Sequence, residues 1–212
     1  MRSGRNETEV PMAFPERLAI ASRNPHKLRE LARICADWPV RWVTVENHDP
    51  ADFPEVDETG ETYLDNAVLK ATEVAAALGL PAIADDSGIE VDALGGAPGH
   101  RSARYAGADA TDERNLEALL GAVRGVPAGG RTARYRCVAA IGWPDGHAEH
   151  TEGMCEGALV ARRRGVRGFG YDPVFVPAGW DETMAELTDE QKDRISHRGR
   201  AFRALAEALR DA

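Results

Sequence analysis

The chain has 212 residues and a net charge of -9, with 43% hydrophobic and 29% charged residues. This is the composition of an ordinary globular protein, and the excess of acid argues against non-specific nucleic-acid binding, which depends on basic surfaces. No apolar run approaches the roughly 20 residues that a membrane span needs, and the N-terminus lacks the apolar core of a secretory signal. Three cysteines without metal-ligand spacing indicate reduced thiols, so we expect a cytoplasmic protein with neither a membrane nor a nucleic-acid partner.

The hydrophobic pattern predicts an α/β protein. Residues 1–16 contain two prolines and no periodicity, so we expect a flexible N-terminal extension followed by a single domain at 17–212. In chain order, the pattern predicts a strand at 18–21, a helix at 25–37, a strand at 40–45, an acidic loop at 47–60, a helix at 61–78, strands at 81–84 and 89–94, a loop at 95–108, a helix at 112–123, a hairpin of 131–142 with 147–160, a strand at 174–176, and helices at 188–195 and 200–210. We expect a mixed-sheet, two-lobed domain with helices flanking the sheet and a cleft between the lobes.

Lysine is rare in this chain. Of the 26 Lys and Arg residues, three are lysines, namely Lys27, Lys70 and Lys192. A chain that uses arginine so freely keeps lysine where a compact ammonium group on a flexible stem is needed. All three lie in motifs that could carry chemistry, which favours a functional role over chance.

A polar turn joins the first predicted strand to the first predicted helix. Its residues are Ser22, Arg23, Asn24, Pro25, His26 and Lys27. Asn24 suits the N-cap and Pro25 the first helical position. Lys27 then falls near the third position, where a cation opposes the helix dipole at a cost of about 0.3–1 kcal/mol. A phosphate bound at the helix start would remove that conflict, whereas the alternative is a solvated lysine on a capped helix.

Carboxylates occur at two further places. Asp85 and Asp86, followed by Ser87, are predicted at the end of a buried strand, where α/β proteins collect ligands. Successive strand residues point to opposite faces, so both aspartates should not face one site, and one of them could hold Mg²⁺. Glu58 precedes the helix at 61–78 and could reach the same metal or only favour the helix start. Lys70 lies at the edge of that helix's apolar stripe, and its side chain either reaches solvent or points into a cleft.

Two C-terminal segments combine glycine, aromatic and charged residues. Glycines flank Phe169, which could stack on a flat base with a gain of about 1–3 kcal/mol or simply pack in the core. The second segment contains Lys192, His197 and Arg198. We expect Gly199 to break the helix there, which places His197 and Arg198 at a helix junction.

In this order, the motifs resemble those of the inosine triphosphate pyrophosphatase family, whose members remove non-standard purine nucleoside triphosphates. The resemblance runs from about Leu18 to Leu209 and rests on the segments SRNPHK, ETGETYLDNAVLKA, ADDSG, GGAPGHRSARYAG, FGYDP and KDRISHRG. The chain departs from the family at Ser22-Arg23, where Thr-Gly is common. The resemblance implies that 17–212 is a catalytic domain for Mg²⁺-dependent hydrolysis of ITP, dITP or XTP to the monophosphate and pyrophosphate.

The resemblance also implies roles for individual residues. Asp86 is the expected proton acceptor and, with Glu58, a Mg²⁺ ligand, while Lys70 supports the phosphates or the attacking water. The residues expected to bind substrate are Ser22, Arg23, Asn24, Pro25, His26, Lys27, Ser87, Phe169, Gly170, Tyr171, Asp172, Lys192, His197 and Arg198. A homodimer is expected, with the loop at 95–108 as a close-packed surface, although that loop could instead only shape the cleft of a monomer.

The base preference follows from hydrogen-bonding patterns. Hypoxanthine and xanthine present a 6-oxo acceptor and an N1–H donor, which donors on Lys192 and Arg198 and an acceptor on Asp172 would match. Adenine reverses both groups, and each unpaired buried group costs about 1–3 kcal/mol. Two other functions stay open: a pyrophosphatase for pyrimidine or modified-base triphosphates, and a non-catalytic nucleotide sensor, which would have no need of Asp86.

Overall fold

The computed structural model describes residues 14–211. Most of the expected extension at 1–16 lies outside this part, but Phe14 and Glu16 already contact the fold. Phe14 packs edge-on against Trp38 with 5.1 Å between ring centres, and the Glu16 carbonyl accepts a 2.9 Å hydrogen bond from the Arg41 N–H. Within 14–211, none of the helices combines the length and hydrophobicity required to cross a membrane.

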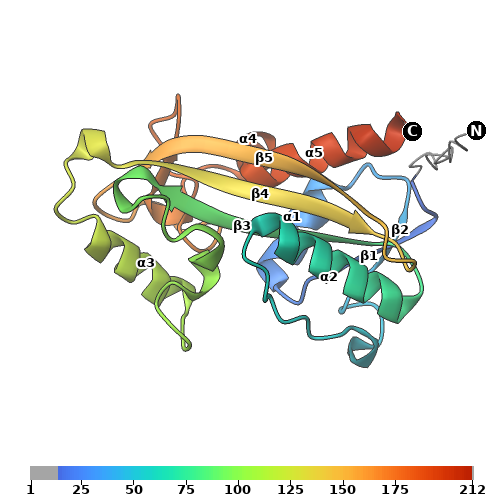
Figure 1. The fold of residues 1–212 in the computed structure, drawn as a ribbon. Helices are drawn as coiled ribbons and strands as arrows, with labels where there is room; N and C mark the ends of the chain where they lie inside the picture. Colours follow the sequence, from blue (N-terminus) through green and yellow to red (C-terminus); the bar gives the residue numbers. More distant parts are fainter. Residues whose placement is uncertain (1–13, 212) are drawn as a thin grey trace, which may run out of the picture.

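The described chain alternates strands and helices in its first half and then forms a long hairpin (Figure 1). Its elements are β1 (Arg17–Ile20), α1 (Pro25–Ile34), β2 (Arg41–Val43), α2 (Tyr63–Leu78), β3 (Ala82–Val91), the short 3-10 helix η3 (Gly99–Arg104), α3 (Asp112–Ala122), β4 (Thr132–Gly142), β5 (Ala148–Leu159), β6 (Phe175–Pro177), α4 (Asp189–Ile195) and α5 (His197–Arg210). The predicted mixed α/β class is confirmed.

One six-stranded sheet organises the fold, in the order β2-β1-β3-β4-β5-β6. β1 runs parallel to β2 and β3, whereas β3, β4, β5 and β6 pair in an antiparallel manner. Helices α1 and α5 pack on one face, and α2 packs on the other (Figure 1). At the far end of the sheet, α3 and the chain around β6 enclose a separate hydrophobic cluster.

β3 corrects one expectation. The predicted strands at 81–84 and 89–94 are one continuous strand, so Asp85 and Asp86 lie in its middle and not at its end. The sequence Asp-Asp-Ser-Gly is typical of turns, but here β4 pairs with every residue of β3 and keeps it extended. On its other side, β1 pairs only with Ala82 and Ile83. The edge of β3 beyond the end of β1 therefore lies open at the two aspartates.

The helix starts follow their capping signals. The Asn24 Oδ1 atom accepts hydrogen bonds from the backbone N–H groups of His26 and Lys27, at 2.9 and 3.3 Å. The Thr188–Gln191 capping box of α4 also forms as expected. Gly199, however, does not break a helix. Ser196 caps α5 and separates it from α4, while Gly199 lies inside the first turn, where a side chain would collide with the Asp193 carbonyl oxygen.

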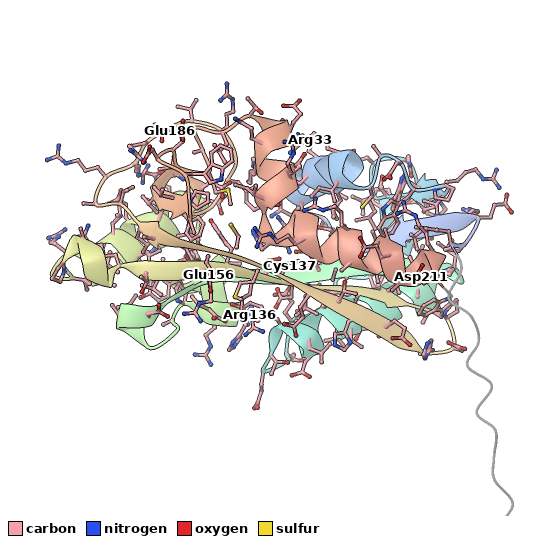
Figure 2. The ribbon with its side chains drawn as sticks, turned by 90° about the horizontal axis from the view of Figure 1, so that it is seen from above. Arg33, Arg136, Cys137, Glu156, Glu186 and Asp211 are labelled. Carbon is pink, nitrogen blue, oxygen red and sulfur yellow. The ribbon has the colours of Figure 1, made fainter. Side chains whose placement is uncertain are left out.

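Alternation along β4 sends neighbouring side chains to opposite faces. Cys137 belongs to the core beneath α1 and α5, whereas Arg136 pairs with Glu90 and Glu152 on the other face (Figure 2). The three cysteines are free and buried, as expected for reduced thiols. Arg33 joins α1 to α4 through Asp193, with 2.7 Å between Nε and Oδ2 (Figure 2).

Candidate active site

A continuous cleft runs around the open edge of β3. We divide it into a first hollow, lined by β3, η3, α3, α4, α5 and the segment 169–172, and a second hollow, lined by residues 21–24, 53–58 and α2. The first hollow has a cavity volume of about 130 Å³. Asn24, Lys27 and Glu58 border both hollows and so join them.

Where the two hollows meet, a lysine lies between two carboxylates. The Lys70 Nζ atom is 2.5 Å from Glu58 Oε1 and 3.6 Å from Asp86 Oδ1. Lys70 is buried on the same face of α2 as Asn66, whose Nδ2 donates to Asp86 Oδ2 at 3.2 Å. The backbone N–H of Ser87 donates to Asp86 Oδ1 at 3.1 Å. Lys70 therefore points into the cleft, and the Asp86 carboxylate is held in one orientation.

The two carboxylates differ in proton affinity. Burial raises the pKa of Asp86, in spite of the nearby charges of Lys70 and Lys27. Burial would also raise the pKa of Glu58, but the charge and hydrogen bond of Lys70 outweigh it and lower that pKa. Asp86 is thus the better base of the pair, and Glu58 stays ionised more readily.

Lys27 has a carboxylate partner. Its Nζ lies 3.2 Å from both the carbonyl oxygen and the Oδ2 atom of Asp85. The same Oδ2 atom accepts from Arg198 Nη2 at 2.9 Å and from the Ser87 hydroxyl at 2.6 Å. Asp85 and Asp86 therefore point to opposite faces of β3, as expected, yet both border the cleft because the strand edge is open.

Buried ion pairs form the floor of the first hollow. The Glu30 carboxylate bridges two cations, at 2.6 Å from Lys192 Nζ and 2.6 Å from Arg198 Nη1. Lys192 Nζ also lies 2.5 Å from Asp172 Oδ2, and the Tyr135 hydroxyl donates to Asp172 Oδ1 at 3.3 Å. Acids and bases alternate along this chain of contacts, so each buried charge has a partner of opposite sign.

These pairings decide which groups stay charged. Burial would raise the pKa of Glu30, but the charges of Arg198 and Lys192 bring it down to about 2. Burial would lower the pKa of Lys192, but the charges of Asp172 and Glu30 raise it above its ordinary value. The donors on Lys192 and Arg198 are therefore charged and fixed in place around neutral pH.

Aromatic rings border the same floor. The Phe169 ring centre lies 5.1 Å from Lys192 Nζ, and the Phe169 N–H donates to Asp172 Oδ2 at 2.9 Å. The His197 ring stacks on Tyr135, with 4.5 Å between centres and planes 6° apart. Burial, with the charge of Arg198, holds the pKa of His197 well below its usual range, so this ring is neutral. The hollow thus combines flat apolar surfaces with fixed donors and acceptors.

A family model described as the Ham1 family matches residues 18–208, which is most of the chain. This chain belongs to the Ham1 family. The "dITP/XTP pyrophosphatase" of Geobacter sulfurreducens is 47% identical over 193 residues, covering 91% of this chain and 96% of that protein. The protein of the same name from Streptomyces coelicolor is 46% identical over 195 residues, covering 92% and 98%. The structure of a HAM1 protein from Coxiella burnetii matches with a TM-score of 0.82 at 36% identity, covering 93% of this chain and 100% of that one.

The Ham1 cleft collects most of the residues expected at the site from the sequence. Those that border the first or second hollow are Ser22, Arg23, Asn24, Lys27, Glu58, Lys70, Asp86, Ser87, Phe169, Gly170, Tyr171, Asp172, Lys192, His197 and Arg198. Pro25 and His26 border neither hollow. Arg23 donates to the carbonyl oxygens of Phe53, at 2.5 Å, and Pro50, at 3.2 Å, and so ties the 50–53 turn to the end of β1.

Sequence reasoning missed Glu30, Tyr135 and Asp112. Asp112 Oδ2 accepts from the Gly170 N–H at 3.0 Å and so connects α3 to the Phe169 segment. None of the three belongs to a local motif. Asn66 did carry a signal, because it lies in line with Tyr63 and Lys70 on the buried face of α2.

Proposed function

We propose that this Ham1-family protein hydrolyses ITP, dITP and XTP to the nucleoside monophosphate and pyrophosphate, acting on the nucleotide pool of the cytosol. Relatives that share 45–48% of their residues with it carry the name "dITP/XTP pyrophosphatase". The observation that supports this function best is the continuous cleft. It places a lysine–carboxylate cluster at one end and a floor of fixed donors and acceptors at the other.

The second hollow suits a triphosphate. A triphosphate carries about four negative charges, which lysines and a metal ion must offset. Lys27 and Lys70 both reach this hollow, and the N-terminus of α1 opens beside it. The helix dipole favours anions at that position, although the first N–H groups of α1 already donate to Asn24. We therefore assign the phosphate-binding turn to residues 22–27.

The residues present also fit Mg²⁺. Glu58 and Asp86 direct carboxylate oxygens toward Lys70 Nζ, so the cleft already holds a cation between them. Mg²⁺ prefers oxygen ligands and is commonly held by one or two carboxylates together with substrate phosphates and water. Within residues 14–211 no group of three or more His, Cys, Asp or Glu side chains has metal-binding geometry, so these two carboxylates would share the ion with the substrate. When bound, Mg²⁺ offsets phosphate charge and polarises the phosphorus–oxygen bonds.

Asp86 supplies the base in this proposal. Its carboxylate takes a proton from the attacking water while the water oxygen bonds to phosphorus and the bridge between the α- and β-phosphates breaks. The side chain of Asn66 and the backbone N–H of Ser87 keep the carboxylate aimed, and burial raises its pKa. Lys70 balances the charge that the carboxylates and phosphates bring together.

The first hollow selects the base. Lys192 and Arg198 offer donors to a 6-oxo group, Asp172 offers an acceptor to N1–H, and Phe169 offers a surface for stacking. The ion pairs of Glu30 hold both cations, so the donors cannot turn away to suit adenine. A base without the matching groups leaves its own buried donors and acceptors unpaired, at about 1–3 kcal/mol for each group.

A pyrophosphate-release assay with ITP, XTP, GTP, ATP and dTTP, with Mg²⁺ and with chelator, tests this function. We expect Mg²⁺-dependent release, with kcat/KM for ITP or XTP at least about 100-fold above that for ATP. Comparable turnover of ATP would reject the base assignment, and faster turnover of dTTP would indicate a pyrimidine enzyme. Tight binding of ITP without release would indicate a nucleotide sensor.

We also propose that the cleft separates two lobes and that the protein is a homodimer. One lobe comprises β1, β2, α1, α2 and α5, and the other comprises α3 and the chain around β6. Residues 95–108 supply the proposed dimer surface, although Ser102 and Ala103 of this loop also border the first hollow. A monomeric mass by light scattering at micromolar concentration would contradict the dimer.

A further inference from the structure

His26 belongs to the phosphate-binding turn, but its side chain lies elsewhere. It borders a third hollow, on the outer side of Phe169, together with Arg29 and Arg33. The His26 ring stacks on the Phe169 ring, with 5.2 Å between centres and planes 24° apart. Phe169 borders both the first and the third hollow, so it forms part of the wall between them, and His26 contacts it from the third hollow.

The orientation of His26 is set by its own helix. Its backbone N–H donates to the Asn24 cap at 2.9 Å, and Pro25 precedes it as the first residue of α1. One turn later, Arg29 Nη2 lies 3.0 Å from His26 Nδ1. A guanidinium group only donates hydrogen bonds, so Nδ1 is the acceptor. The ring therefore has a fixed backbone on one side and a fixed hydrogen bond on the other.

Phe169, by contrast, has little support from its neighbours in sequence. Gly168 and Gly170 flank it with φ values of +71° and +59°, which are backbone conformations that glycine adopts freely. The Phe169 N–H is bonded to Asp172, but this bond leaves the ring free to turn about its side-chain bonds. Lys192 Nζ and Arg198 Cζ lie 5.1 and 5.7 Å from the ring centre, and the stacked imidazole adds a flat partner that fixes the plane of the ring.

We propose that His26 is a positioning residue that supports Phe169 from its outer side, so that the inner side is presented to the purine. Because His26 lies between Asn24 and Lys27, the same contact connects the phosphate-binding turn to the base-binding segment. This inference rests on the proposed function of the cleft. Stacking acts on any flat base, so His26 sets how strongly a nucleotide binds and not which base is preferred.

Steady-state kinetics of His26→Ala and His26→Phe test this role. For His26→Ala we expect KM for ITP to rise about 10-fold with kcat within about twofold, and the ratio of kcat/KM for ITP over ATP to stay within about twofold. Inhibition by inorganic tripolyphosphate, which has no base, should not change. His26→Phe keeps a flat ring and should restore KM to within about twofold of the unmodified protein.

A double-mutant cycle with Phe169→Ala locates the effect. If His26 acts through Phe169, adding His26→Ala to Phe169→Ala raises KM no further. Glu190→Ala, in the same third hollow and outside the stack, is the control and should leave all parameters unchanged. Weaker tripolyphosphate inhibition in His26→Ala, failure of His26→Phe to restore KM, or additive effects in the cycle would each overturn the inference. Failure of the unmodified protein to hydrolyse ITP would instead overturn the proposed function.

Discussion

The two ends of the cleft use charge in different ways. At the proposed phosphate end, around the second hollow, Lys70 and Lys27 lie at the meeting point of loops, a helix start and an open strand edge, beside carboxylates that a metal ion could share. At the first hollow, the proposed base end, Glu30, Lys192 and Arg198 are almost fully buried, and each is paired with protein groups of opposite charge. In the first arrangement a ligand can still supply or offset charge, whereas in the second every charged group already has a partner within the protein.

The two ends should therefore differ in how much stability is lost when a charged side chain is removed. Buried ion pairs are expensive to break because the remaining partner stays desolvated, so the base end couples selectivity to stability. The phosphate end is less completely buried, with 18% of the Lys27 side chain and 28% of the Glu58 side chain exposed, so it can lose a charge and remain folded. Mutations at the phosphate end should therefore reduce turnover, and mutations at the base end should reduce stability as well.

Asp86→Asn is the sharpest test at the phosphate end. The amide keeps the size of the carboxylate but cannot take a proton, so we expect kcat for ITP to fall at least about 1,000-fold. Thermal melting should remain close to that of the unmodified protein, since the oxygen of the new amide can still accept a hydrogen bond from Asn66 or Ser87. Turnover within about tenfold of normal would remove Asp86 from the mechanism.

Arg198→Met tests the base end. This change leaves Glu30 and Asp85 buried without their shared cation, so the free energy of unfolding should fall by about 3–5 kcal/mol. Arg210→Met on the same helix removes an exposed ion pair with Asp37 and should cost less than about 1 kcal/mol. Equal effects of the two substitutions in chemical denaturation would contradict the comparison between the two ends.

The contacts at the start of α1 could be predicted from the sequence better than the ion pairs beneath the first hollow, and distance along the chain explains why. The Asn24 cap, Pro25 and Lys27 are consecutive or nearly so, and their roles follow from the start of one helix. Glu30 has no such signal, because its meaning depends on Arg198, 168 residues away. A buried glutamate cannot be distinguished from a surface one until its partners are placed.

Strand β3 shows the same limit in the backbone. The turn-like residues Asp85, Asp86 and Ser87 predicted a break, whereas pairing with β4, about 50 residues later, keeps them extended. The aspartates do not lie at the end of their own strand, but they do lie close to a strand end. They lie beside the end of β1, the neighbouring strand, so the open edge still forms where ligands are expected.

Lys27→Ala distinguishes two effects on stability, one expected from the helix dipole and the other from the contact between Lys27 and Asp85. The helix dipole alone predicts unchanged or higher stability without ligand, but the contact with buried Asp85 reverses that sign. We expect the free energy of unfolding to fall by about 1 kcal/mol and KM for ITP to rise about 10-fold. Denaturation without nucleotide and kinetics with ITP measure the two effects. Higher stability in the variant would restore the dipole argument.

Acid should affect the two ends at different pH. Asp86 must be ionised to act as a base, and its pKa is raised, so kcat/KM should fall as pH drops through that raised value. Glu30 has a pKa of about 2 in the folded protein against 4.5 for the ordinary group, so its stabilising contribution is complete above about pH 4.5 and is lost as pH falls toward 2. Activity should therefore decline before stability does. Parallel loss of both, measured from pH 7 to 3, would contradict this order.

Asp112→Ala should give the smallest effect, because it removes one hydrogen bond between α3 and the Phe169 segment in the first hollow. Asp112 Oδ2 accepts from the Gly170 N–H, next to Phe169, and a bond of this kind contributes about 1 kcal/mol. We expect KM for ITP to rise about threefold to fivefold, with kcat and tripolyphosphate inhibition unchanged, because the base segment loosens while the phosphate turn does not. Glu113→Ala removes a neighbouring acid from the same first turn of α3, but Glu113 reaches Arg163 and not Gly170, so this control should leave KM unchanged. An equal rise in both variants would mean that the charge at the start of α3 matters and that the bond to Gly170 does not.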